Sequence, residues 1–371
     1  MKENIDGKHY YATVFLGNPA APYYFDIDTG SDLTWVQCAN LQRTSHAPYN
    51  PHNAFILCKD FFCSLVPQPP TNPCTSPTDQ CHFMVDYIDS RTTGILVRDS
   101  FLFRLTNGTI IPATVTFGCA YNQNVRSPSH APPPVDGVLG LAALSDSLPS
   151  IVLQLADRGI IRNVLGHCLG SQGVGYFFVG DELLSSTGII WTPLLSSATN
   201  FYMPGHAQLL YDGINTGNVG LYAFDSRSTY TYFLPETYNL VLHLIESNLV
   251  GKPLDEALED PTLPVCWKGP TSFNSIGQVN SYFKPLGLGF VNGTNAQLHL
   301  TLENYLIISN HGNVCLGILD GSTVEGLGFN LIGDISMQDK LFVYDNENGR
   351  IGWADPSNCN NPPSCNFLPY T

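Results

Sequence analysis

Two short stretches of this chain hold an acidic residue in a setting that suits acid–base chemistry. In the first, a strand-like run ends at Asp28, and three small residues, Thr29-Gly30-Ser31, follow it. A carboxylate at the mouth of a buried strand is costly unless hydrogen bonds stabilise it, and such a turn supplies backbone N–H groups and hydroxyls. Taken alone, Asp-Thr-Gly is typical of an ordinary surface turn.

The second stretch repeats this arrangement, because another apolar run ends at Asp225 and continues as Ser226-Arg227-Ser228. The two acids lie 197 positions apart (225 − 28), about half the chain. We therefore expect two similar lobes that each contribute one carboxylate to a shared cleft. Two carboxyl groups held close together cannot both ionise easily, so they share a proton; such a pair can activate water and protonate a leaving group.

Further motifs accompany the acids. Trp35 stands seven residues after Asp28, Tyr87 opens a hairpin-like run, and each half contains an apolar segment that ends in Gly. With the two acidic turns, these stretches resemble the pepsin-like aspartic proteinases, and within them the plant nucellin-like group, over nearly the whole chain. The flap-like run and the two apolar-Gly segments are residues 87–96, 136–141 and 331–334.

The resemblance implies a mainly β, bilobal acid-protease fold with two β-barrel-like lobes around a central cleft. We expect an N-terminal lobe at residues 1–184, with the Asp28 loop and the flap. A C-terminal lobe at residues 185–371 would hold the Asp225 loop and an irregular tail. The implied activity is that of an aspartic endopeptidase that works best at acid pH and hydrolyses peptide bonds with an activated water, without a metal or other cofactor.

The resemblance also implies roles for the neighbours of the acids. Thr29 and Ser226 would bond to each other's loop across the lobe interface. Ser31 and Ser228 would each donate to the outer carboxylate oxygen of the acid in its own turn. Tyr87 would cover the bound peptide and Trp35 would steady its hydroxyl, although an aromatic residue in a hairpin more often only packs. The expected supporting residues are Thr29, Gly30, Ser31, Ser226, Arg227 and Ser228.

Arg227 departs from the family pattern, because active relatives have Gly at this place in the loop. A guanidinium about 4 Å from a carboxylate, at an effective dielectric near 20, contributes on the order of 4 kcal/mol, which lowers the carboxyl pKa by about 3. Both acids would then stay ionised, which predicts a catalytically impaired pseudo-protease that binds or inhibits a peptide or protein. In the opposing interpretation, Arg227 turns toward solvent or the outer cleft and only narrows specificity.

Arg91, near the expected flap tip, is a second basic residue. An exposed loop Arg is the simpler interpretation. If Arg91 and Arg227 both line the cleft, acidic side chains of the substrate should be preferred.

The elements that must position these residues can be read from the sequence pattern. We expect strands at residues 10–16 and 22–27, a flap hairpin at 81–103 with residues 90–93 near its tip, and a surface loop at 122–134. Ser147 to Ser150 should open a helix, and residues 235–249 should form another, with Pro235 in its first turn.

The composition limits the partners. Formal net charge is −15 and only 13% of residues are charged. Nucleic acid and anionic membranes would require a basic surface, and no apolar run is long enough to span a bilayer. We therefore expect neither nucleic acid nor a membrane as a partner. The resemblance implies a polypeptide substrate in the inter-lobe cleft, and we expect a monomer.

Eleven cysteines indicate an oxidising compartment. A zinc site at Cys58 and Cys63 is disfavoured because their spacing is loose and no paired knuckle follows. The odd count leaves at least one thiol unpaired or joined to another chain, and the connectivity stays open.

Asn107 and Asn292 each begin an Asn-Gly-Thr glycosylation pattern. Residues 1–4 lead directly into the first strand-like run without a signal-peptide pattern, so we expect a mature-like chain from a secreted or vacuolar protein.

Overall fold

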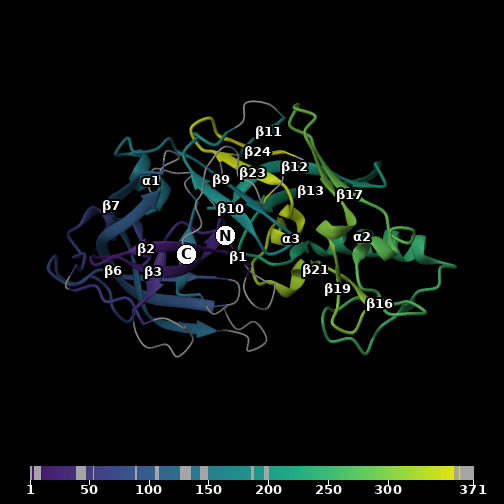
Figure 1. The fold of residues 1–371 in the computed structure, drawn as a ribbon, viewed down its shortest axis with the longest axis horizontal. Helices are drawn as coiled ribbons and strands as arrows, with labels where there is room; N and C mark the ends of the chain where they lie inside the picture. The colour runs from purple at the N-terminus through teal and green to yellow at the C-terminus, as the bar shows by residue number, and fades with distance from the viewer. Residues whose placement is uncertain are drawn as a thin grey trace.

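The computed structural model describes residues 2–3, 10–38, 47–52, 54–87, 90–104, 108–125, 135–142, 149–184, 188–195, 200–354 and 359. In this part of the chain, strands greatly outnumber helices and form four sheets. Figure 1 shows two lobes with a further sheet between them: strands β2, β3, β6 and β7 lie in one lobe, and helix α2 with strands β16, β17 and β19 lies in the other. The expectation of a mainly β, bilobal fold is confirmed.

The first sheet builds the lobe that carries Asp28. Its parallel neighbours β3 and β8 come from distant parts of the sequence, and β6 and β7 form its long antiparallel ladder. Its strands, in spatial order, are β1 (Lys2–Glu3), β2 (Tyr10–Leu16), β3 (Ala21–Asp28), β8 (Gly137–Gly140), β4 (Trp35–Gln37), β7 (Ile110–Val125), β6 (Ser90–Arg104) and β5 (His82–Asp86).

The other lobe repeats the central part of this plan. There β13 pairs in parallel with β22, and β14 pairs antiparallel with β22, as β3 and β4 do with β8. The strands of this sheet are β18 (Gln297–Leu300), β17 (Leu286–Phe290), β12 (Tyr202–Tyr211), β13 (Ile214–Phe224), β22 (Asn330–Ile332), β14 (Thr231–Phe233) and β21 (Ile318–Asp320).

The sheet between the lobes combines strands from both halves of the sequence, and a smaller sheet extends the second lobe. The sheet between the lobes consists of β10 (Gly175–Val179), β9 (Val164–Leu169), β23 (Leu341–Asp345), β24 (Arg350–Ala354) and β11 (Ile190–Pro193). The smaller sheet consists of β15 (Asp255–Glu256), β16 (Cys266–Lys268), β20 (Val314–Leu316) and β19 (Leu306–Ile308).

The helices are few and short. In α2, Pro235 occupies the first turn and the buried face includes Val241 and Ile245, which agrees with the helix predicted at residues 235–249. Ser150 caps α1 by accepting a hydrogen bond from the backbone N–H of Val152 at 3.3 Å. The helices are α1 (Ile151–Ala156), α2 (Pro235–Leu249) and α3 (Asp334–Met337), with 3₁₀ turns at Phe61–Leu65, Ile276–Val279, Leu302–Asn304 and Gly321–Thr323. None of the helices in the described ranges has the length and apolarity needed to cross a membrane.

Residues 90–93 lie near the tip of the flap hairpin, as expected, because β6 begins at Ser90 and Arg91 pairs with Asp86. The β-branched Thr92 and Thr93 favour the extended ladder that follows the turn. One expected element needs correction: the loop expected at 122–134 does not begin at residue 122, since residues 122–125 continue β7. Residues 88–89, 126–134 and the tail at 360–371 lie outside the described residues.

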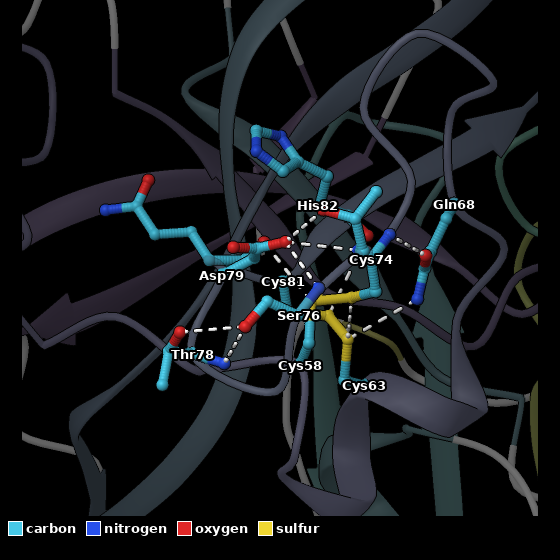
Figure 2. The surroundings of a disulfide bond; sticks show 11 residues. Cys58, Cys63, Gln68, Cys74, Ser76, Thr78, Asp79, Cys81 and His82 are labelled. Carbon is cyan, nitrogen blue, oxygen red and sulfur yellow. Dashed lines mark hydrogen bonds between the residues drawn. A yellow bond between two sulfur atoms is a disulfide. The ribbon is translucent and has the colours of Figure 1, made fainter.

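Ten of the cysteines form disulfides in the described residues, at Cys38–Cys119, Cys58–Cys74, Cys63–Cys81, Cys168–Cys359 and Cys266–Cys315. Figure 2 shows how closely two of them approach, with the Cys63 and Cys74 sulfurs 3.6 Å apart. The Cys58 and Cys63 sulfur atoms, which were considered as zinc ligands, therefore form disulfide bonds. Cys365 lies outside the described residues.

Candidate active site

The first acidic loop surrounds Asp28 with donors from its own turn. The backbone N–H of Gly30 donates to Asp28 Oδ1 at 2.8 Å, and the Ser31 hydroxyl donates to Oδ2 at 2.6 Å. Strand β3 delivers the acid to this place through its parallel pairing with β8, where Asp28 lies opposite Gly140.

The second loop holds Asp225 with the same pattern. The backbone N–H of Arg227 donates to Asp225 Oδ1 at 3.0 Å, and the Ser228 hydroxyl donates to Oδ2 at 2.7 Å. The backbone N–H of Asp225 is bonded to Ile332 of β22 at 3.0 Å. Both carboxylates therefore have one oxygen bound by a backbone N–H and the other by a hydroxyl.

Reciprocal hydrogen bonds join the two loops. The Thr29 N–H donates to the Ser226 hydroxyl at 3.1 Å, and the Ser226 N–H donates to the Thr29 hydroxyl at 3.0 Å. The Ser226 hydroxyl donates in turn to the carbonyl of Ile27 at 2.8 Å. A Cβ atom added to Gly30 would lie only 3.0 Å from the Asp225 carboxyl carbon, so the two acidic loops are in direct contact.

The apolar-Gly segments pack tightly beneath the acids. A Cβ atom added to Gly333 would lie 2.1 Å from the carbonyl oxygen of Tyr230, which leaves room only for glycine. The backbone N–H of Gly333 donates to the Thr231 hydroxyl, and that of Gly140 donates to the Thr34 hydroxyl, both at 3.1 Å. An equivalent buried threonine, Thr34 in one half and Thr231 in the other, thus supports each half of the site.

Burial and mutual repulsion control the ionisation of the acids. Asp28 and Asp225 are 2% and 7% exposed. Burial, followed by the charge of Asp225, raises the pKa of Asp28 to about 7, and burial also raises the pKa of Asp225. Arg227 lowers both pKa values by less than these effects raise them. The pKa of both acids is thus raised, opposite in direction to the lowering expected from Arg227 alone.

Tyr87 directly follows the flap strand β5 and lies near Asp28 and Ser31. The indole N–H of Trp35 donates to the Tyr87 hydroxyl at 2.7 Å, and Tyr87 is only 8% exposed. Burial, followed by the charge of Asp28, raises the pKa of the Tyr87 hydroxyl, which stays protonated. The structure thus brings the two aromatic residues predicted for the cleft together with the acid pair.

Arg227 takes a position that neither sequence interpretation foresaw. Its side chain crosses to the first lobe, where Nε lies 3.3 Å from Oδ2 of Asp26. Its guanidinium carbon stands 4.3 Å from the centre of the Tyr87 ring. Sequence reasoning missed Asp26. The available signal was an acid two residues before Asp28, because alternate residues of a strand point to the same face.

The remaining predicted residues lie apart from the acids. Arg91 is exposed and forms a two-bond ion pair with Asp86, at 2.6 and 3.0 Å. Asn292 lies in an exposed turn after β17 and donates to Thr192 and to the carbonyl of Pro204. Asn107 lies outside the described residues.

Comparisons with known proteins agree with this architecture. The family models described as xylanase inhibitor N-terminal and C-terminal match residues 10–181 and 208–355. An aspartic proteinase of Oryza sativa subsp. japonica is 39% identical over 365 residues, covering 94% of this chain and 87% of its own. Aspartic proteinase nepenthesin-1 of Nepenthes gracilis is 26% identical and covers 94% of this chain and 78% of its own.

A solved structure extends the comparison at the level of fold alone. The crystal structure of basic 7S globulin from soybean superposes with a TM-score of 0.76 at 14% identity, covering 100% of this chain and 98% of its own. From these matches, and from two acidic loops that mirror each other across the lobe interface, the chain belongs to the plant pepsin-like aspartic proteinase family.

Proposed function

We propose that the protein is an aspartic endopeptidase whose acid pair is Asp28 and Asp225. The observation that carries this proposal is the matched binding of the two carboxylates by their own turns, together with the reciprocal Thr29–Ser226 bonds that hold the loops in contact. Raised pKa values at both acids favour a pair that keeps one proton at acid pH.

In the proposed reaction the ionised member of the pair accepts a proton from a water molecule as the water oxygen attacks the peptide carbonyl carbon. The protonated member donates its proton to the carbonyl oxygen, which gives a tetrahedral diol. The acid that took the proton from water then passes it to the amide nitrogen. As the C–N bond breaks, a diol hydroxyl gives its proton back to the pair, which leaves a carboxylic acid, an amine and a pair that again holds one proton. The peptide lies beneath Tyr87, and because both acids are nearly covered, the flap must move aside before it binds.

The wider setting follows from the same family assignment. The disulfides suit a secreted or vacuolar protein, and Asn292, in its exposed turn, is the proposed glycan acceptor within the described chain. We further propose a monomer with lobes at residues 1–184 and 185–371.

The proposal is tested by incubating the purified protein with a mixed peptide library across acid and neutral pH. Wild type should cut internal bonds, and Asp28→Asn should not. Asp255→Asn, at an exposed carboxylate of β15, is the matched control and should cut as wild type does. Cleavage by Asp28→Asn at a rate near that of wild type would refute the assignment.

A second candidate is a binding protein without catalytic activity. It is favoured by the position of the Arg227 side chain, which is only 11% exposed, pairs with Asp26 and contacts Tyr87. The matched family models are named for xylanase inhibitors, so a xylanase is a suitable partner to test. Inhibition of a xylanase by wild type and by Asp28→Asn alike, without peptide cleavage, would favour this candidate.

A further inference from the structure

The Arg227 side chain enters a hollow in the wall of the first lobe beside the acid pair. About 10 Å³ of space remains there, which is the lower limit for a single water molecule. We call this hollow the Arg227 pocket. It is lined by Asp26, Trp35, Gln37, Gln123, Val135 and Val138, with Arg227 itself.

The Arg227 pocket has the chemistry of a cation-binding site. Its acid, Asp26, is 1% exposed and lies 3.3 Å from Arg227 Nε. The face of the Tyr87 ring covers the guanidinium at 4.3 Å. A buried carboxylate attracts a guanidinium by its charge, and an aromatic face adds a cation–π attraction.

The lining residues all come from the first lobe, whereas the occupant comes from the second. Asp26 stands two residues before Asp28 on β3, so the two side chains emerge on the same face of the strand. The Tyr87 ring contacts the guanidinium of Arg227, and its hydroxyl accepts a hydrogen bond from Trp35, which lines the pocket. A polypeptide bound beneath the flap would therefore pass next to this pocket.

We propose that the Arg227 pocket is a recognition site for an Arg or Lys side chain of a polypeptide ligand, next to the bond at the acid pair, and that Arg227 is its intramolecular occupant. This inference rests on the proposed function in one respect, that the polypeptide lies across Asp28 and Asp225. Arg should bind better than Lys, because its planar guanidinium both pairs with a carboxylate and stacks on an aromatic ring. Removal of the Arg227 side chain opens the pocket and leaves Asp26 at its floor.

The test measures binding rather than cleavage. Each peptide has a reduced, non-hydrolysable isostere in place of its central bond. In the first set, Arg, Lys, norleucine or Glu stands directly before this isostere, and in the second set it stands directly after it. Arg227→Gly should bind the Arg peptide of one set at least about tenfold more tightly than its norleucine partner, a difference of about 1.4 kcal/mol. Wild type should show little preference, and Asp26→Asn/Arg227→Gly should lose it. The proposal is overturned if Arg227→Gly binds the Arg and norleucine peptides equally, or if the double variant still prefers the Arg peptide.

Chemical rescue keeps the test valid if Arg227→Gly folds poorly. Ethylguanidinium, which restores the missing group, should raise the Tm of Arg227→Gly and leave wild type and the double variant unchanged. Arg350→Ala is the matched control, since Arg350 also pairs with a carboxylate, Asp345, and covers a ring, Trp191, away from the acids. Rescue of Arg350→Ala to the same extent, or none for Arg227→Gly, counts against the pocket.

The outcomes also separate this inference from the proposed function. If Arg227→Gly prefers the Arg peptide but neither it nor wild type cuts any library, the pocket stands and the endopeptidase assignment falls. If wild type cuts peptides while Arg227→Gly binds every isostere alike, the endopeptidase stands and the pocket falls.

Discussion

The two acidic loops make the same hydrogen bonds and differ at their third residue. In the first loop this residue is Gly30, and an added Cβ would lie 2.9 Å from the Phe201 ring and 3.0 Å from the Asp225 carboxyl carbon. In the second loop it is Arg227, whose N–H still donates to Asp225 at 3.0 Å. Neither residue has a positive φ. The backbone of the loop thus accepts a side chain, and the space available in the opposite lobe decides whether one fits.

The largest effect should come from removing either acid, which tests whether the loops are equivalent in function. Asp28→Asn and Asp225→Asn should each lower kcat for peptide hydrolysis by about 10²–10⁴, because the reaction requires both members of the pair. Initial rates at a fixed acid pH provide the measurement. A variant that keeps near-normal activity would show that its loop has no catalytic part.

The next effect concerns the side chain that distinguishes the loops. Arg227→Gly or Asp26→Val alone should lower the free energy of unfolding by about 3–5 kcal/mol, because each leaves its partner's charge buried. The double variant should cost much less than the sum, as denaturant unfolding would show. Arg350→Ala, where the Arg side chain is 41% exposed, should cost about 1 kcal/mol or less. Additive losses at Asp26 and Arg227 would mean that the pair is not coupled.

Shared burial of the acids predicts a pH dependence. The pKa of Asp28 is raised from 3.8 to about 7, so between these values the native state binds more protons than the unfolded state. The free energy of unfolding should fall as pH rises through this window, by about 1.4 kcal/mol per pH unit, and activity should disappear as pH rises through about 7. Asp28→Asn should flatten the stability slope. A slope unchanged in that variant would assign it to other groups.

A smaller effect tests the crowding around the first loop. Gly30→Ala should destabilise the protein by about 1–3 kcal/mol, because the new methyl group meets Phe201 and Asp225. Phe201→Ala should relieve part of this loss when the two changes are combined. Thermal unfolding of both variants provides the comparison, and an unaffected Gly30→Ala protein would remove crowding as the reason for glycine.

The smallest effect concerns the two hydroxyl donors. Ser31→Ala and Ser228→Ala should each cost about 1–2 kcal/mol, because each removes a hydrogen bond to a carboxylate. Both hydroxyls lower the pKa of their acid, so the basic limb of the pH–activity profile should move to higher pH in each variant. A shift in only one variant would show that the loops hold their protons unequally.

Much of the fold could be predicted because local sequence and duplication carry strong signals. Pro235 and an apolar face at helical spacing place α2 at the residues that the structure gives. The loop expected at 122–134 was started too early, because the polar Asn122, Gln123 and Asn124 suit a loop, yet they pair with β6 in the structure. Disulfide pairing could not be predicted, since chain order does not determine which sulfur atoms meet.

The partner of Arg227 could not be predicted from the sequence, for a related reason. Asp26 precedes Arg227 by 201 positions (227 − 26), and only the assembled lobes bring the two side chains together. Local sequence identified the unusual residue and predicted its charge effect with the correct sign. It could not show that burial and Asp225 would outweigh that effect.

The paired disulfides of Figure 2 have a mechanical consequence for the flap. Cys81, bonded to Cys63, directly precedes β5, and both cysteines share an apolar cluster with Phe83 and Leu96. The root of the hairpin is thereby clamped to the body of the lobe. When the flap opens, the hairpin must therefore bend at its far end, around Tyr87, while its base stays fixed.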